Sequence, residues 1–148
     1  MTLKSRINED MKAAMRARDS ARLLPIRMLL AAIKQREIDE RKELSETEVV
    51  GVVEKMLKQR RESIVQYEKA GRGDLVQAES LELSVLEAYM PEAMSEAELE
   101  AAVTEVIESS GARGIGDMSK VMGGLKARLA GRADMGRVSA LVRARLSD

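Results

Sequence analysis

The chain has 148 residues, of which 45% are apolar and 34% are charged, and its formal net charge is zero. That length allows one domain or two small ones, and the apolar fraction is sufficient for a buried core. There is no cysteine and no histidine, which excludes disulfides, thiol catalysis, Ser-His-Asp triads and histidine-ligated metal sites. A mechanism based on carboxylates or lysine alone stays open, but we expect no catalytic residue, no metal and no cofactor.

The first helices are predicted from apolar spacing and capping residues. The apolar set is mainly Leu, Val, Ile, Met and Ala, without Phe or Trp, and it favours helices over strands. Apolar residues at i, i+4 spacing predict a helix over residues 3–17. Asp19 or Ser20 can cap a second helix that ends near Glu40. Pro25 falls near its first turns, which predicts a kink or a later start of that helix.

The middle of the chain contains two further helices. A capping box, in which Ser45 and Glu48 satisfy each other's backbone amides, begins a long third helix. The glycine-rich residues 71–73 end it in a turn. Asp74 can cap a fourth helix, which Pro91 stops. We place a domain boundary at this proline.

Three shorter helices are predicted in the last third of the chain. Ser95 and Glu98 form a second capping box, and Asp117 follows a glycine-rich loop as a further N-cap. The three helices run over residues 96–109, from Asp117 to about Ala130, and from about Met135 to Leu146.

No β-hairpin signal interrupts the helical pattern, so the predicted fold class is all-α. We expect an elongated four-helix domain over residues 1–90 and a small three-helix domain over residues 93–148. The first residues contain no apolar run, which argues against a signal peptide. No stretch approaches the roughly 18 apolar residues of a membrane span. We therefore expect a cytoplasmic protein that does not enter the membrane.

Charge is unevenly distributed along the chain. Residues 1–42 carry 11 basic and 6 acidic side chains, a net +5, and residues 113–148 carry 8 and 3, again +5. Residues 43–112 between them carry 6 basic and 16 acidic side chains, a net −10. This pattern indicates either a polyanionic partner contacted by the basic ends or ends that fold back on the acidic middle.

Arg60 lies on an apolar helix face. At roughly 100° per residue, it falls near the centre of the face that Val53 and Ile64 share. A charged group there must reach water or find a carboxylate. We predict a structural ion pair that sets the register of two helices, with a ligand-binding arginine as the alternative. The candidate partners on the next helix are Glu79, Glu82 and Glu87.

A row of basic residues follows the second helix. Arg27, Lys34 and Arg41 are spaced by seven and drift by only ~20° per step, so they form a stripe. Such a stripe can follow the phosphates of a nucleic acid. The alternative is a solvated face with intrahelical ion pairs such as Arg36 with Glu40.

A second basic cluster covers the last two helices. The Gly123-Gly124 pair within it leaves a smooth surface that a nucleic acid can approach closely. We predict an RNA-facing surface here. The alternative is that the two glycines allow helices to pack closely and that the basic side chains only keep the C-terminal helices hydrated. The cluster consists of Lys120, Lys126, Arg128, Arg132 and Arg137, with Arg143 and Arg145 beside them.

Six runs of sequence resemble the GatB/YqeY family, and together they span nearly the whole chain. They are RMLLAAIKQREID (27–39), KQRRES (58–63), YEKAGRGDL (67–75), LEAYMP (86–91), MSKVM (118–122) and GRAD (131–134). The resemblance implies a four-helix part followed by a three-helix part.

Members of this family resemble the tail domain of the GatB subunit of tRNA-dependent amidotransferases, which contacts the tRNA and lies outside the catalytic sites. The resemblance therefore implies a non-catalytic tRNA-binding or accessory module. A carbon–nitrogen ligase activity with glutamine as amido donor also belongs to the family's description, but this chain resembles only the appended domain. The alternative is a protein–protein adaptor that docks on an amidotransferase or synthetase assembly.

Overall fold

A computed structural model describes residues 1–147. They form seven α-helices and one short 3-10 helix, with no strand in that range, which confirms the all-α prediction. The contacts divide the chain between Met90 and Pro91 into an N-terminal unit of four helices and a C-terminal unit of three. That each unit folds as an independent domain stays a prediction. No helix over residues 1–147 combines the length and the apolar character that crossing a membrane requires.

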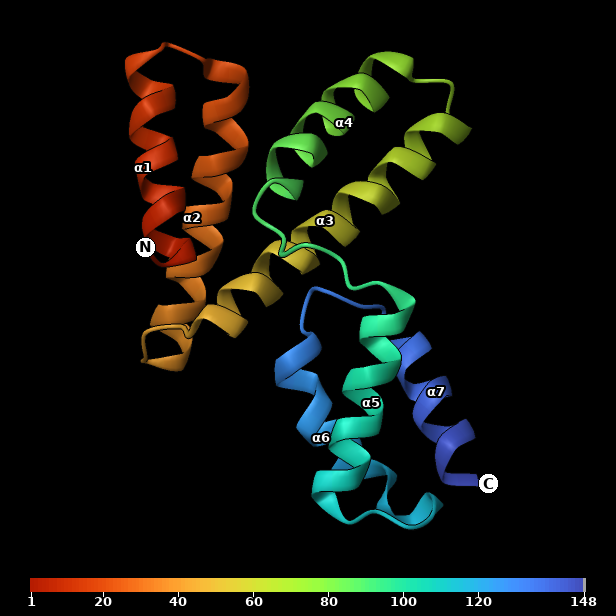
Figure 1. Ribbon diagram of the computed structural model, residues 1–148. Helices are drawn as coiled ribbons and strands as arrows, with labels where there is room; N and C mark the ends of the chain where they lie inside the picture. The colour runs from red at the N-terminus through yellow and green to blue at the C-terminus, as the bar shows by residue number, and fades with distance from the viewer. Residues whose placement is uncertain (148) are drawn as a thin grey trace. The chain divides into compact units, whose positions relative to one another are not determined.

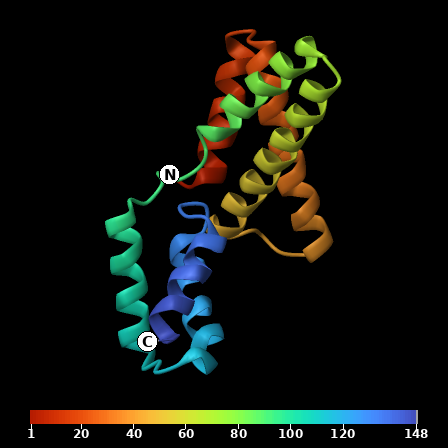
Figure 2. The same ribbon diagram turned by 90° about the vertical axis from the view of Figure 1, so that its right-hand side faces the viewer.

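The N-terminal unit consists of two helical hairpins. Figure 1 shows α1 (Leu3–Arg16) beside α2 (Ser20–Glu40) and α3 (Glu46–Lys69) beside α4 (Gly73–Glu87), and Figure 2 shows the same pairs from the side. One face of each helix is apolar, and these faces meet in a single core. Its most deeply buried members are Ile7, Ile26, Leu29, Ile33, Val49, Val53, Leu57 and Leu86.

Of the two outcomes predicted for α2, a kink or a later start, the later start is wrong. The helix begins at Ser20, because Asp19 accepts a hydrogen bond from the Arg22 amide at 3.2 Å and fixes the first turn before the proline. Pro25 lies inside the helix and is buried. It removes only the hydrogen bond to the carbonyl of Ala21. Since Ala21 is exposed, water can bond that carbonyl instead.

The predicted cap of α4 is also wrong. The helix begins at Gly73 with Arg72 as its N-cap, so Asp74 lies inside the first turn. The Arg72 guanidinium donates to both carboxylate oxygens of Asp74, at 3.0 and 3.1 Å. These bonds lower the pKa of Asp74. Gly71, at φ 69°, supplies the left-handed turn between α3 and α4 that the sequence predicted.

The capping box at the start of α3 is confirmed. The Glu48 amide donates to Ser45 Oγ at 3.2 Å, and the Ser45 amide donates to the Glu48 carboxylate at 3.1 Å. Lys42 Nζ lies 2.9 Å from the same carboxylate. The hydrogen bond from Lys42, followed by that from the Ser45 amide, lowers the pKa of Glu48 to about 2. Glu48 therefore stays charged well into the acidic range.

Glu48→Gln is expected to destabilise the protein at neutral pH and to remove part of its acid sensitivity. The pKa of Glu48 is about 2 in the folded chain and about 4.3 in an unfolded one. The charged carboxylate thus stabilises the fold above pH ~4.3 and loses this effect as the pH falls towards ~2. Urea unfolding of wild type and variant should differ at neutral pH and converge between these two values. Glu54→Gln, an exposed change on the same helix, is the control, and a pH-independent difference for Glu48→Gln would contradict this account.

The C-terminal unit is a three-helix bundle. It contains α5 (Glu96–Ser110), the 3-10 helix η1 (Ile115–Asp117), α6 (Met118–Leu129) and α7 (Met135–Ser147). Its core is made almost entirely of Leu and Val side chains from the three helices. The fully buried members are Val121, Leu125, Leu129, Val138 and Val142, with Leu99, Ala102, Val103, Val106 and Leu146 around them.

Two capping predictions in this unit need correction. Ser95 caps α5 by accepting from the Glu98 amide at 3.1 Å, but only this half of the predicted capping box forms among the described residues. Asp117 is the N-cap residue of α6, as predicted, but its side chain makes no capping hydrogen bond and instead accepts from the Arg113 amide at 3.0 Å. That bond lowers the pKa of Asp117 and closes the loop before α6.

Candidate nucleic-acid interface

The seven side chains of the predicted C-terminal basic cluster fall into two groups, and the first faces α5. Arg128 donates to Glu105 at 3.1 Å, and both guanidinium contacts of Arg137 with Glu96 measure 3.2 Å. The hydrogen bond with Glu96 raises the pKa of Arg137. The Arg132 guanidinium lies 3.6 Å from the Glu98 carboxylate and donates to the Glu92 carbonyl at 3.0 Å. Arg145 donates to the Thr104 hydroxyl. These four arginines therefore already have partners within the unit.

The second group consists of Lys120, Lys126 and Arg143, which we call the outer basic surface. All three are exposed, and none has a carboxylate within 4.0 Å among the described residues. Lys126 lies two residues, or about 200° of helix turn, from Arg128, and Arg143 has the same relation to Arg145. Lys126 and Arg143 therefore lie on the edges of α6 and α7 that are turned away from α5.

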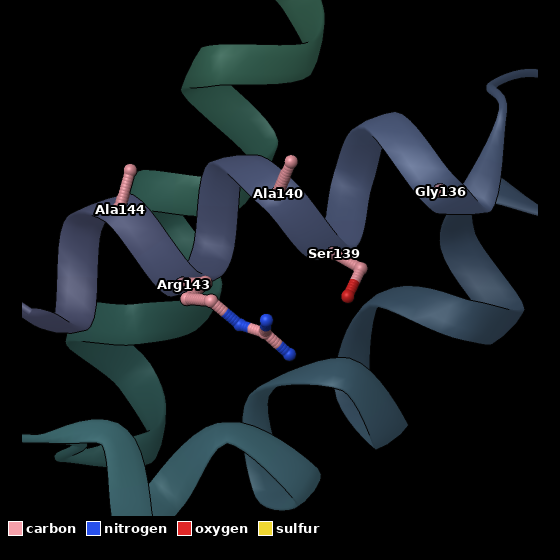
Figure 3. Close-up of a pocket in the computed structure, with 5 residues that line it drawn as sticks. All are labelled: Gly136, Ser139, Ala140, Arg143 and Ala144. Atoms are coloured by element: carbon pink, nitrogen blue, oxygen red, sulfur yellow. The ribbon is translucent and has the colours of Figure 1, made fainter.

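A hollow of about 430 Å³ lies along α7, and Arg143 of the outer basic surface lines it. Figure 3 shows Ser139 and Arg143 on one side of α7, both turned towards the neighbouring α6 ribbon. A hydroxyl and a guanidinium are the donors that commonly bind phosphate oxygens. The other lining residues are small, so a ligand backbone can approach α7 closely. They are Gly136, Ala140 and Ala144.

The two adjacent glycines of α6 have different surroundings. A Cβ at Gly124 would lie 2.9 Å from Val106 Cγ1 of α5, whereas a Cβ at Gly123 would meet nothing within 4 Å. Gly124 therefore allows close packing of α6 on α5, which was the structural alternative from the sequence. Gly123 leaves open surface that a partner can approach.

A model of the Yqey-like protein family matches residues 4–146. The chain belongs to this family. The match spans both units, so the resemblance that the six sequence runs indicated is confirmed for nearly the whole chain.

Curated relatives of this Yqey-like protein are named altered inheritance of mitochondria protein 41, mitochondrial. The Eremothecium gossypii protein is 46% identical over 85 residues, which cover 57% of this chain and 46% of the relative. The proteins of Kluyveromyces lactis and Lachancea thermotolerans are 38% and 36% identical over 105 and 104 residues, covering 68% of this chain and 56% of each relative. The chain thus spans about half the length of the curated relatives it matches. Because those relatives are named as mitochondrial, a cytoplasmic location stays a prediction for this Yqey-like protein.

The basic row on α2 is only partly helical in this Yqey-like protein. Arg27 and Lys34 are exposed on α2, and neither has a carboxylate within 4.0 Å among the described residues. Arg41 lies one residue past the helix as its C-cap, with a left-handed backbone at φ 55°. The row therefore consists of two helical residues and one residue of the following turn.

Arg60 lies between two carboxylates of α4. Its Nε atom is 3.0 Å from Glu82 Oε2 and 3.5 Å from Glu79 Oε2, and its side chain is only 15% exposed. Glu87, the third candidate partner, instead lies 3.5 Å from the exposed Arg61. Arg60 Nε and Glu79 Oε2 are buried without a hydrogen bond among the described residues, so the group is held mainly by charge attraction. The role of Arg60 in setting helix register stays a prediction.

Sequence reasoning missed a tyrosine that joins the middle of α1 to the residues that follow α4. Tyr89 is buried, and its hydroxyl donates to Asp10 Oδ2 at 2.7 Å. Burial, followed by the bond to Asp10, raises the pKa of Tyr89. Arg6 covers the ring at 5.1 Å from its centre and donates to the Ala88 carbonyl. The only signal was that Tyr89 belongs to the run LEAYMP; nothing in the sequence indicated its partners.

Proposed function

We propose that this Yqey-like protein is a non-catalytic tRNA-binding module, related to the appended domain of tRNA-dependent amidotransferases. The observation that carries the proposal is the outer basic surface. Lys120, Lys126 and Arg143 are exposed and unpaired in the described part of the chain, while the other four residues of the C-terminal basic cluster have partners. No described carboxylate lies within 4.0 Å of these three side chains; the nearby Asp134 instead accepts from the Gly136 amide at the edge of the hollow.

The chemistry favours contact with the nucleic-acid backbone over reading of bases. Lysine and arginine bind phosphates without sequence preference and release counterions, so such binding weakens with salt. Recognition of unpaired bases relies on aromatic side chains for stacking. The chain has two tyrosines and no Phe or Trp, and Tyr89 is buried in the N-terminal unit. Shape and charge therefore dominate the proposed recognition.

Replacing Lys120, Lys126 and Arg143 together with glutamine is expected to weaken binding of total tRNA by about 10-fold or more at moderate salt. Arg128→Gln combined with Arg137→Gln is the matched control, because these arginines are paired within the unit and their loss should change tRNA affinity much less. Filter binding of the purified full-length variants measures both effects. If the control loses as much affinity as the outer-surface variant, the outer basic surface is not the binding site.

A second candidate function is a protein–protein adaptor that docks on an amidotransferase or synthetase assembly. It is favoured by large apolar side chains that are exposed on the N-terminal unit, among them Leu24 and Ile38. Co-purification of a defined protein after nuclease treatment, without measurable tRNA affinity, would support this candidate over the first. For both candidates we keep the cytoplasm as the proposed compartment.

A further inference from the structure

The solvent face of α2 carries an apolar stripe. Leu24 is 54% exposed, Met28 39% and Ile38 59%. At roughly 100° per residue, these three side chains and Ala31 fall within an arc of about 80°. The opposite side of the same helix packs into the core of the N-terminal unit. The helix is therefore apolar on two sides. On the outer side Met28 Sδ accepts a hydrogen bond from Arg60 of α3 at 3.5 Å, whereas Leu24 and Ile38 remain more than half exposed.

The spacing of the stripe is that of a helix-pairing seam. Leu24, Met28, Ala31, Gln35 and Ile38 alternate in steps of four and three, which is the a/d pattern of two packed helices. From Leu24 to Ile38 the stripe runs about 21 Å, or two heptads. Such a surface fits another helix better than a loop or a flat sheet face.

A basic row borders the stripe along one side. Arg27 and Lys34 lie about 20–40° beyond Ile38 around the helix. Both are exposed and have no ion-pair partner within the described residues, and Arg41 extends the row past the helix end. Positions beside a helix-pairing seam select the partner by charge. The charge that complements this row is negative.

Beyond the proposed binding of tRNA, we propose that this face of α2 docks an amphipathic helix of a partner protein, with a two-heptad apolar seam flanked by Glu or Asp. A second copy of this chain is disfavoured, because its α2 would present the same basic row and like charges repel. A nucleic acid is disfavoured because its phosphates would lie against Leu24 and Ile38, which gain nothing from that contact. A partner helix with Glu or Asp beside its apolar seam covers the apolar stripe and also pairs with the basic row.

The test uses two synthetic helical peptides with leucine at the seam positions, one flanked by glutamate and the other by lysine. The full-length protein is expected to bind the glutamate peptide about 10-fold more tightly in fluorescence anisotropy. Arg27→Glu combined with Lys34→Glu should reverse this preference, and Leu24→Ser combined with Ile38→Ser should weaken binding of both peptides. Lys58→Glu combined with Lys69→Glu on α3 is the charge-matched control, because both lysines are exposed and neither lines the hollow beside Gln35; it should leave the preference unchanged.

Two results would overturn the proposal. One is a peptide-binding result: either the wild-type protein binds the two peptides equally, or the α2 substitutions leave peptide affinity unchanged in variants whose circular dichroism shows intact helices. The other is a variant with Arg27→Glu and Lys34→Glu that loses tRNA affinity and keeps its peptide preference, since the row would then serve RNA. Failure of tRNA binding at Lys120, Lys126 and Arg143 would leave the α2 proposal standing.

Discussion

Replacing Gly124 with alanine is expected to destabilise the C-terminal unit by up to about 2 kcal/mol, although alanine is the better helix former. The added Cβ would lie 2.9 Å from Val106 Cγ1, and Val106 is itself buried, with a stiff branched side chain. The helix α6 must therefore move away from α5 or strain the core. Overpacking of this kind typically costs ~1–3 kcal/mol, which exceeds the ~1 kcal/mol gained from helix propensity.

The neighbouring Gly123 offers a matched control. A Cβ there meets nothing within 4 Å, so Gly123→Ala is expected to stabilise the same helix by about 1 kcal/mol. Urea unfolding of the full-length protein, followed by hydrogen exchange in α5 and α6, measures both variants. The two variants should differ in their free energies of unfolding by about 1–3 kcal/mol. Equal stabilities would show that α6 does not pack on α5 as closely as described.

Replacing Arg60 with methionine is expected to destabilise the N-terminal unit by about 2 kcal/mol. Methionine keeps the apolar stem of the side chain but leaves Glu79 and Glu82 together without a cation. Removing one partner of a buried pair costs ~3–5 kcal/mol, because a buried charge is left uncompensated. The three side chains retain 15–20% exposure, so the expected cost is smaller than for a fully buried pair.

Arg61 provides the comparison for this variant. It lies next in the chain and 3.5 Å from Glu87, but both side chains are more than half exposed. Arg61→Met is therefore expected to change the free energy of unfolding by less than about 0.5 kcal/mol. Adding Glu79→Gln and Glu82→Gln to Arg60→Met should recover much of the lost stability. If the triple variant is no more stable than Arg60→Met alone, charge does not explain the cost.

The sequence was a good guide to the helices and a poorer guide to their ends. Apolar spacing and the Ser45–Glu48 capping box predicted α3 because both depend on neighbours within one or two turns. The N-cap of α4 was misplaced because Asp74 pairs with Arg72. Asp117 was correctly placed as the N-cap residue of α6, but its side chain bonds the Arg113 amide instead of an amide of the helix. A short polar side chain has several local partners, and the sequence alone does not rank them.

The candidate site shows the same limit over longer separations. The sequence identified the basic cluster on α6 and α7, but it did not separate Lys126 from Arg128, two residues later. That difference arises because Arg128 meets Glu105 across 23 residues of chain when α6 packs on α5. The pairing of Tyr89 with Asp10 spans 79 residues and was likewise invisible. Which charges remain available to a ligand is thus a property of the packed helices.

The salt dependence of tRNA binding tests the central claim most directly. For the wild-type protein and for the variant with Lys120, Lys126 and Arg143 changed to glutamine, the logarithm of the binding constant is plotted against the logarithm of salt concentration. Each phosphate contact contributes about 0.7–0.9 to the slope. We predict that the variant's slope is shallower by about 2–3, with weaker binding at low salt. Identical slopes and affinities for the two proteins would contradict the assignment of the outer basic surface to tRNA.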